Sequence, residues 1–286
     1  PPPPPPPVLH AQDAKRDLDS SLVGSEMCIR DRFQLASLAE SAFDPLARTC
    51  RFMLKEEAHH MFVGATGVGR VLARTLELMR EHDTDDVHPY GGINLDILQK
   101  YMNFHYSVSL DLFGSETTTN AANYYSGGLK GRFHEEQRDD DHRLTDVHRL
   151  VPEVTDAGIG EREVTQLSAL NETLRDDYTV DCQKGVDRWN RALDEAGSDV
   201  ELRLPHIGFH RQVGTFAGHH VSPDGRLLTD DEWGGALDDW LPTDDDRAHV
   251  ESLMAGVTEP GKMAGWIAPP SNGINQKPVD YDYVRL

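Results

Sequence analysis

The chain has 286 residues, 38% of them hydrophobic, which is enough for one large domain or two small ones. Its 49 acidic and 28 basic residues give a formal net charge of -21, which repels nucleic acid and anionic membrane surfaces. No apolar run reaches the roughly eighteen residues of a membrane span. The three cysteines are widely spaced, which is typical of a reducing compartment. We therefore expect a cytoplasmic protein with no nucleic-acid partner and no membrane contact.

Residues 1–32 differ in character from the rest of the chain. They open with seven prolines, which favour an extended polyproline II conformation. Residues 20–32, SSLVGSEMCIRDR, resemble the read-through of a sequencing adaptor. We interpret residues 1–32 as a non-native or disordered leader and assign them no function.

The first half of the remaining chain has the periodicity of helices. Apolar residues recur every three or four positions, and Asp44-Pro45 supplies an N-cap followed by a proline at the first helical position. Gly64, Gly67 and Gly69 weaken the helical pattern where they occur. The pattern predicts helices over residues 33–43, 45–63, 64–82, 94–113 and 118–126.

The second half predicts further helices and then a change of structure. A highly charged helix is expected over residues 128–149, a polar connector over 151–163 and a long amphipathic helix over 164–196. Residues 200–204 alternate like a strand. We therefore predict a mainly α protein: a helical part over residues 33–196 and an irregular α+β extension over 197–286 that wraps around it.

The stretch RFMLKEEAHHMFV, residues 51–63, places acidic and imidazole side chains among apolar ones. Helical geometry puts Glu57 and His60 on one face, and burying them is costly unless they pair with each other or bind a metal. One open interpretation is a buried histidine paired with a glutamate. Glu56 and His59 form a competing pair one residue earlier, but the neighbours of Glu57 are slightly more apolar, so we favour Glu57 and His60.

Glu-x-x-His is also the ligand unit of ferritin-like di-iron proteins. There, two helices each supply one such unit and two other helices each supply one carboxylate. Carboxylate oxygens and imidazole nitrogens suit iron. The motif therefore predicts a metal site in a partial ferritin-like bundle, with Glu57 and His60 as ligands.

Longer motifs make the comparison more specific. Several segments, some with distinctive Trp, Pro and His residues, resemble the oxygenase subunits of the benzoyl-CoA 2,3-epoxidase family. The segments are FDPLARTCRFMLKEEAHHMFVG (43–64), NFHYSVSLDLFG (103–114), SGGLKGRF (126–133), ALNETLRDDY (169–178), GVDRWN (185–190), WLPTDDDRAHVESLM (240–254) and EPGKMAGWIAPPSNGIN (259–275). The resemblance covers roughly residues 33–286.

The resemblance implies an oxidoreductase that uses two iron ions and O2. The implied reaction is epoxidation of the ring of benzoyl-CoA to 2,3-epoxybenzoyl-CoA in aerobic benzoate catabolism. Electrons would come from NADPH through a separate reductase component carrying FAD and Fe–S groups.

The chain departs from this family pattern upstream of Phe33. The family has an earlier Glu-x-x-His helix, a preceding carboxylate and an aspartate close to this point, and none is recognisable here. Asp31 lies near the expected aspartate, but within the leader, so we do not assign it that role. We therefore expect an N-terminally truncated oxygenase chain, inactive as it stands.

Coenzyme A carries several phosphate charges, so cations are expected at its binding site. Lys130, Arg132 and Arg211 are the candidates in the sequence. His105, between two aromatic residues, is expected to be a core residue rather than a ligand.

Two other functions remain open. One is a metal-free ferritin-like protein that binds an acyl-CoA or a protein partner. The other is a metal-dependent hydrolase built on Asp111, Asp139 and His142, although the polar neighbours of Asp139 and His142 favour a solvated charged helix face.

Overall fold

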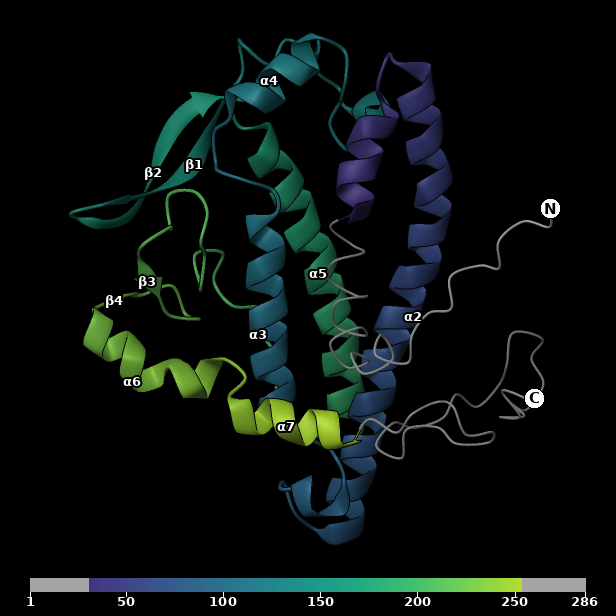
Figure 1. The fold of residues 1–286 in the computed structure, drawn as a ribbon, viewed down its shortest axis with the longest axis vertical. Helices are drawn as coiled ribbons and strands as arrows, with labels where there is room; N and C mark the ends of the chain where they lie inside the picture. Colours follow the sequence, from purple (N-terminus) through teal and green to yellow (C-terminus); the bar gives the residue numbers. More distant parts are fainter. Residues whose placement is uncertain (1–30, 254–286) are drawn as a thin grey trace, which may run out of the picture.

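The computed structural model describes residues 31–253, and three long helices dominate it. They are α2 (Asp44–His82), α3 (Leu95–Asp111) and α5 (Leu170–Glu195), which run lengthwise through the molecule (Figure 1). Residues 31–39 form a further helical segment next to the first half of α2. The mainly α class predicted from the sequence is confirmed.

The core lies between the long helices. One cluster joins the C-terminal half of α2 to α3, α5 and α7 (Asp244–Leu253), and includes Leu72, Leu98 and Leu193. A second cluster joins α3 and α5 to the segment 31–39 through Tyr106, Tyr178 and Phe33. Burial of these large side chains from several helices supplies the main stabilisation of the bundle.

Helix α2 is one continuous helix of 39 residues, although the sequence predicted two. Gly64 and Gly67 lie inside it and are buried, so tertiary packing outweighs their weak helix propensity. Asp44 is the first helical residue rather than the N-cap, and Phe43 occupies the cap position without a side-chain hydrogen bond. Pro45 does lie in the first turn, as expected.

The helix predicted over residues 94–113 is confirmed as α3, and that over 118–126 as α4 (Thr119–Ser126). The link between α2 and α3 contains a short 3-10 helix, η2 (His88–Tyr90).

The prediction for residues 128–163 was wrong. The expected charged helix is a loop with one 3-10 turn, η3 (Glu135–Gln137), and the expected connector lies in an antiparallel hairpin of β1 (His148–Thr155) and β2 (Gly158–Thr165). His134 and His142 have φ of 51° and 57°, a left-handed conformation that ends any helix there. Val151, within β1, is fully buried, so the hairpin packs onto the body of the molecule.

The C-terminal part is irregular α+β, as predicted. Helix α5 begins at Leu170 because the residues before it belong to β2 and a turn. The strand expected over 200–204 does not form: the Asn190 side chain donates to the carbonyl of Leu202 and accepts from its N–H, in place of a neighbouring strand. Beyond it come β3 (His220–Val221), β4 (Leu227–Leu228), α6 (Asp230–Trp240) and α7.

Residues 1–30 and 254–286 lie outside the described part, and with them most of the leader and the last segment of the family resemblance. None of the helices in residues 31–253 combines the length and apolar character that crossing a bilayer requires.

Candidate metal and ligand site

Glu57 and His60 lie on the same face in the first half of α2. The Nδ1 atom of His60 is 3.5 Å from Oε1 of Glu57, and the Glu57 side chain is 13% exposed, against 51% for His60. The spacing of three residues brings the two groups together, as the sequence predicted. This arrangement places a largely buried carboxylate beside an accessible imidazole.

The surroundings of this pair are more open than the apolar sequence suggests. Phe52 and Phe62 are each 67% exposed, and Met53 and Val63 are also exposed. Phe52, Phe62 and Val63 lie on the side of α2 away from Glu57, so among the described residues that side is uncovered. Cys50 and Gly64, which share the face of Glu57, are buried.

The neighbouring pair, Glu56 and His59, points into solvent. Both residues are exposed, whereas the side chain of Glu57 is largely buried. A carboxylate held inside the protein is the better candidate for an internal metal, so burial favours Glu57 over Glu56.

One carboxylate oxygen of Glu57 is suited to act as a metal ligand. Its Oε2 atom is buried and has no hydrogen-bond partner among the described residues. A buried carboxylate oxygen without a partner is costly, and a bound cation would remove this cost. Within residues 31–253 no third candidate ligand joins Glu57 and His60, since the one group of three found there is Glu135, Asp140 and His142. The pair therefore fits part of an iron site rather than a whole one.

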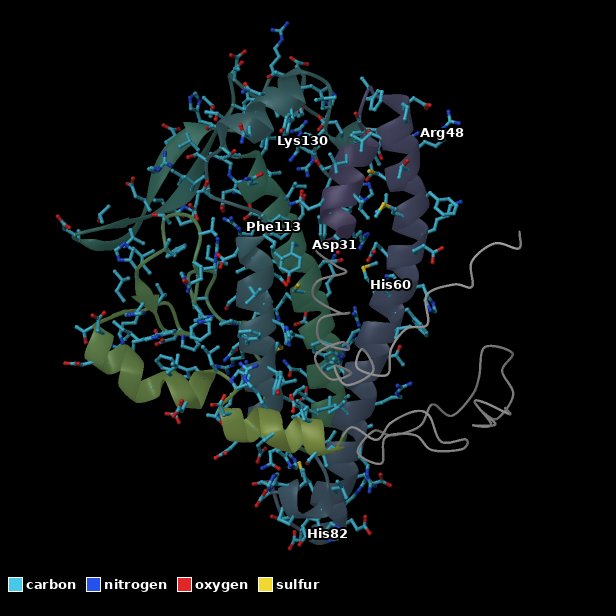
Figure 2. The ribbon with its side chains drawn as sticks, in the orientation of Figure 1. Asp31, Arg48, His60, His82, Phe113 and Lys130 are labelled. Atoms are coloured by element: carbon cyan, nitrogen blue, oxygen red, sulfur yellow. The ribbon has the colours of Figure 1, made fainter. Side chains whose placement is uncertain are left out.

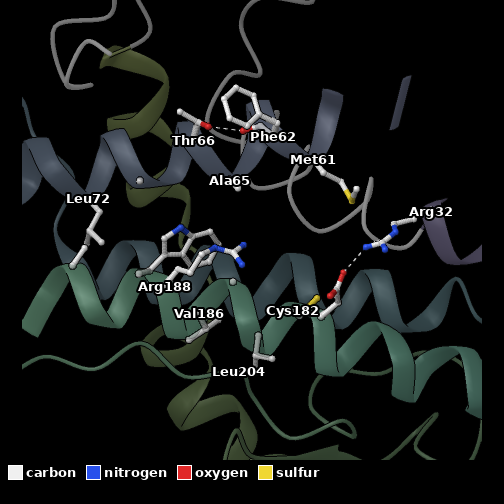
Figure 3. Close-up of a pocket in the computed structure, with 15 residues that line it drawn as sticks. Arg32, Met61, Phe62, Ala65, Thr66, Leu72, Cys182, Val186, Arg188 and Leu204 are labelled. Atoms are coloured by element: carbon white, nitrogen blue, oxygen red, sulfur yellow. Dashed lines mark hydrogen bonds and ion pairs between the residues drawn. The ribbon is translucent and has the colours of Figure 1, made fainter. Parts of the chain in front are cut away.

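A cavity of about 650 Å³ opens between α2 and α5, beginning at Met61, one helical turn after Glu57 (Figure 3). Its walls are mainly apolar and include Leu72, Val186 and Trp189. The sequence analysis missed this feature. The available signal was the small residue Gly69 on one helix and Gly185 on the other, which leave space where the helices face each other.

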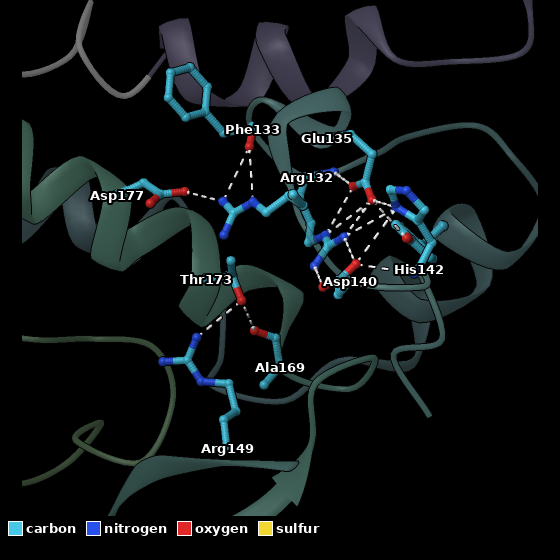
Figure 4. A network of polar contacts seen from close by, with 11 residues as sticks. Arg132, Phe133, Glu135, Asp140, His142, Arg149, Ala169, Thr173 and Asp177 are labelled. Carbon is cyan, nitrogen blue, oxygen red and sulfur yellow. Dashed lines mark hydrogen bonds and ion pairs between the residues drawn. The ribbon is translucent and has the colours of Figure 1, made fainter. Parts of the chain in front are cut away.

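Arg132, a candidate for binding coenzyme A phosphate, is instead the centre of a buried polar network (Figure 4). Its guanidinium donates to the carboxylates of Glu135 and Asp140, with shortest distances of 2.6 Å to each. His142 Nδ1 lies 2.5 Å from Oε1 of Glu135. Arg132 thus supplies the positive charge in a cluster that otherwise has the composition of a metal site.

The pKa values in this network follow from the same contacts. Burial alone would raise the pKa of Glu135, but hydrogen bonds from Arg132 and His142 outweigh it and hold the pKa at about 2. The hydrogen bonds from Arg132 also lower the pKa of Asp140 to about 2. Both carboxylates are therefore ionised at neutral pH and neutralise Arg132, which leaves little charge for a phosphate.

Arg211 is also occupied within the protein. Its side chain is fully buried, its Nε is 2.5 Å from Oδ1 of Asp111, and it donates to the carbonyls of Ile207 and Val213. Lys130 lies near α4, far from His60 in Figure 2, and burial lowers its pKa. Two of the three cations proposed for coenzyme A, Arg132 and Arg211, thus have internal partners.

The hydrolase alternative gains no support from this geometry. Asp111 binds Arg211 and the backbone N–H groups of Gln212 and Val213. Asp139 is exposed and is not in the group formed by Glu135, Asp140 and His142. His105, expected in the core, is 7% exposed.

Comparison with known proteins adds a decisive observation. No family model matches the chain, but it is 57% identical over 258 residues to benzoyl-CoA oxygenase component B of Aromatoleum evansii. The chain is homologous to this oxygenase component. The alignment covers 89% of the chain and 54% of the relative, so the chain spans about half the length of benzoyl-CoA oxygenase component B. The resemblance found in the sequence is thereby confirmed.

Proposed function

We propose that this chain is part of an oxygenase subunit that epoxidises the ring of benzoyl-CoA, with Glu57 and His60 as one of its two Glu-x-x-His iron-binding pairs. The observation that carries the proposal is the buried, unpartnered Oε2 of Glu57, one helical turn from a ligand-sized cavity. The 57% identity to benzoyl-CoA oxygenase component B supports the substrate class.

In this proposal the residues of the chain have distinct roles. Glu57 supplies negative charge to the metal site, and His60 supplies a neutral nitrogen whose half-exposed position leaves it free to turn toward a metal. Two bound irons would supply the activation of O2. The apolar walls between α2 and α5 would exclude water and orient the ring, and the product would be 2,3-epoxybenzoyl-CoA.

The electrons would come from NADPH through a separate reductase component with FAD and Fe–S groups. Two protein ligands do not hold two irons, because the ferritin-like pattern uses a second Glu-x-x-His and two further carboxylates. We therefore expect residues 31–253 alone to bind little iron and to be inactive.

The test is the iron content of a chimera that joins this chain to the part of benzoyl-CoA oxygenase component B that it does not cover. The chimera should bind about two irons per chain, and Glu57→Ala should remove at least one of them. With the reductase, NADPH and O2, the iron-loaded chimera should add one oxygen atom to benzoyl-CoA, as detected by mass spectrometry.

Glu56→Ala is the matched control, since the neighbouring glutamate is exposed. It should leave the iron content unchanged. Loss of iron in Glu56→Ala with retention in Glu57→Ala would shift the ligand assignment by one residue. A chimera that folds but binds no iron would overturn the di-iron proposal.

A second candidate function is favoured by the cavity, which does not depend on a metal. A metal-free protein could use the same space to bind an acyl-CoA. Tight binding of benzoyl-CoA by an iron-free chimera that never gains oxygenase activity would support this function.

A further inference from the structure

A groove of about 480 Å³ lies where α2 ends and α3 begins, against the segment 200–202. In Figure 2 this end of α2, marked by His82, is opposite the end that carries Lys130. Leu95 and Leu202, which are 7% and 1% exposed, line the groove together with Met79. The groove therefore has an apolar interior and a volume typical of binding sites, roughly 300–1,000 Å³.

The charged side chains that line this groove are all negative, namely Asp85, Asp86, Asp96 and Glu201. Glu201 is 2.6 Å from a neighbouring arginine, and Asp86 accepts a hydrogen bond from Asn94. Asp85 and Asp96 are exposed, and their carboxylates have no ion pair or hydrogen bond within residues 31–253. The first turn of α3 has the partial positive charge of a helix N-terminus, which Asp96 offsets. The groove thus has an apolar interior and an uncompensated negative rim.

A second groove, of about 370 Å³, adjoins the first and shares Met79 and Asp85 with it. Asp83 and Ala196, the C-cap residues of α2 and α5, both line it. The C-terminal end of a helix has a partial negative charge, so two helix ends add to the carboxylates here. Arg80 is the one cation among the residues that line this second groove. The negative potential therefore continues from the start of α3 to the end of α5.

These features select one kind of ligand. The one group of three potential metal ligands found within residues 31–253 lies elsewhere, so the carboxylates of the grooves are not arranged for a metal ion. An apolar interior with an acidic rim instead suits a cation on an aliphatic chain. Lysine and arginine side chains have this form, because their methylene groups lie on apolar surface while the charge stays at a polar edge.

We propose that the two adjoining grooves, together called the acidic groove, bind a basic segment of a partner protein. Lysine or arginine side chains of the partner would lie along Met79 and Leu95, with their charges facing Asp85 and Asp96. The net charge of -21 would attract such a partner from a distance. Met79 lies about 33 Å along α2 from Glu57, at about 1.5 Å per residue, so the site is separate from the candidate metal ligands and does not rest on the proposed function.

The first experiment measures binding of a dye-labelled peptide of alternating lysine and alanine to the 286-residue chain by fluorescence anisotropy. Asp85→Asn combined with Asp96→Asn should weaken binding about three- to tenfold at about 0.1 M salt. Asp139→Asn combined with Asp141→Asn is the matched control, since it changes the net charge equally at exposed residues that line neither groove. The control should weaken binding by less than about twofold. Equal weakening by both pairs would mean nonspecific attraction and would overturn the proposal.

The second experiment tests the apolar contact without changing charge. Val200, which lines the groove, is 43% exposed, and Val200→Ser should weaken peptide binding about two- to fivefold. Val180→Ser is its control, since Val180 is 57% exposed on α5 and lines neither groove. It should leave binding unchanged. Binding that Val200→Ser does not weaken would show that the side chains do not lie in the groove.

Two further measurements identify the occupant. The small amine 1,5-diaminopentane should displace the peptide only at concentrations at least about tenfold above the Kd of the peptide. Displacement at equal affinity would make this a site for small amines and would overturn the protein partner. A peptide that binds the 286-residue chain but not the chimera would show that the added half covers the groove, which would also overturn it.

The outcomes separate this inference from the proposed function. In the chimera, the pair Asp85→Asn and Asp96→Asn should weaken peptide binding and leave the iron content unchanged. A chimera that binds the peptide through these residues but holds no iron would refute the di-iron function alone. A chimera with iron and activity that does not bind the peptide would refute the acidic groove alone.

Discussion

At the scale of single residues, Arg132 shows how much a buried ion pair contributes to the stability of the fold. It is 1% exposed, and Glu135 and Asp140 depend on it for neutralisation. Replacing it with Met would leave two carboxylates close together without a cation. We expect Arg132→Met to lower the free energy of unfolding by about 3 kcal/mol, measured by urea denaturation at pH 7. Arg48→Met, which removes an exposed pair with Asp44, should cost less than about 0.5 kcal/mol.

The same network predicts a dependence on pH. The pKa of Glu135 is about 2 in the folded protein and 4.5 in the absence of partners, so its contribution to stability is complete above about pH 4.5. It is lost as the pH falls toward 2, because the unfolded chain binds the proton first. In Arg132→Met this part of the pH dependence should be much reduced. An unchanged acid-unfolding profile in the variant would show that Arg132 does not control the pKa of Glu135.

Arg132 also shows why part of the candidate site could not be predicted. From the sequence alone, Arg132 and Arg211 are two cations that a phosphate could bind. The sequence does not show which carboxylates lie beside them in the folded protein. Glu57 and His60 could be selected because both lie within one turn of a single helix. The cavity between α2 and α5 could not be predicted, since the residues that line it are more than a hundred residues apart in the chain.

At the scale of helices and strands, the spacing of apolar residues predicted the helices that bury one face against the core. Helices α3, α4 and α5 were found from it, and so were both parts of α2. The loop over residues 128–147 was mistaken for a helix because its charged residues have helical propensity. Tertiary contacts decide that region: Arg132 is drawn inside, and Arg138 binds the carboxylate of Asp177 on α5.

Glycines in helices and turns give a prediction at this scale. Gly69→Ala should raise the free energy of unfolding by about 0.5–1 kcal/mol, because alanine favours the helix and its methyl group meets no atom within 4 Å. Gly92→Ala should lower it by about 1–3 kcal/mol, because the new Cβ would lie 2.6 Å from Cδ1 of Leu78 and 2.8 Å from Cγ2 of Val87. Urea denaturation of both variants measures the change in the free energy of unfolding. A change of the same sign in both variants would contradict the packing around one of these glycines.

At the scale of the whole molecule, two opposing features meet. The net charge of -21 keeps copies of the chain apart, whereas the first half of α2 exposes large apolar side chains, Phe52, Met53, Phe62 and Val63. Which one dominates depends on ionic strength, since the distance over which exposed charges interact falls from about 30 Å at 0.01 M salt to about 3 Å at 1 M.

We therefore expect the 286-residue chain to be mainly monomeric at 0.01 M salt and to associate at 1 M, as measured by sedimentation velocity. Removing an apolar side chain from water contributes at most about 1.5–3 kcal/mol, so a few residues suffice for weak association. The double variant Phe52→Gln and Val63→Gln should associate much less, because both residues are exposed on a similar side of α2 and their charge is unchanged. If the mass stays monomeric at every salt concentration, or the variant associates like the parent chain, the exposed face of α2 is not the cause of association.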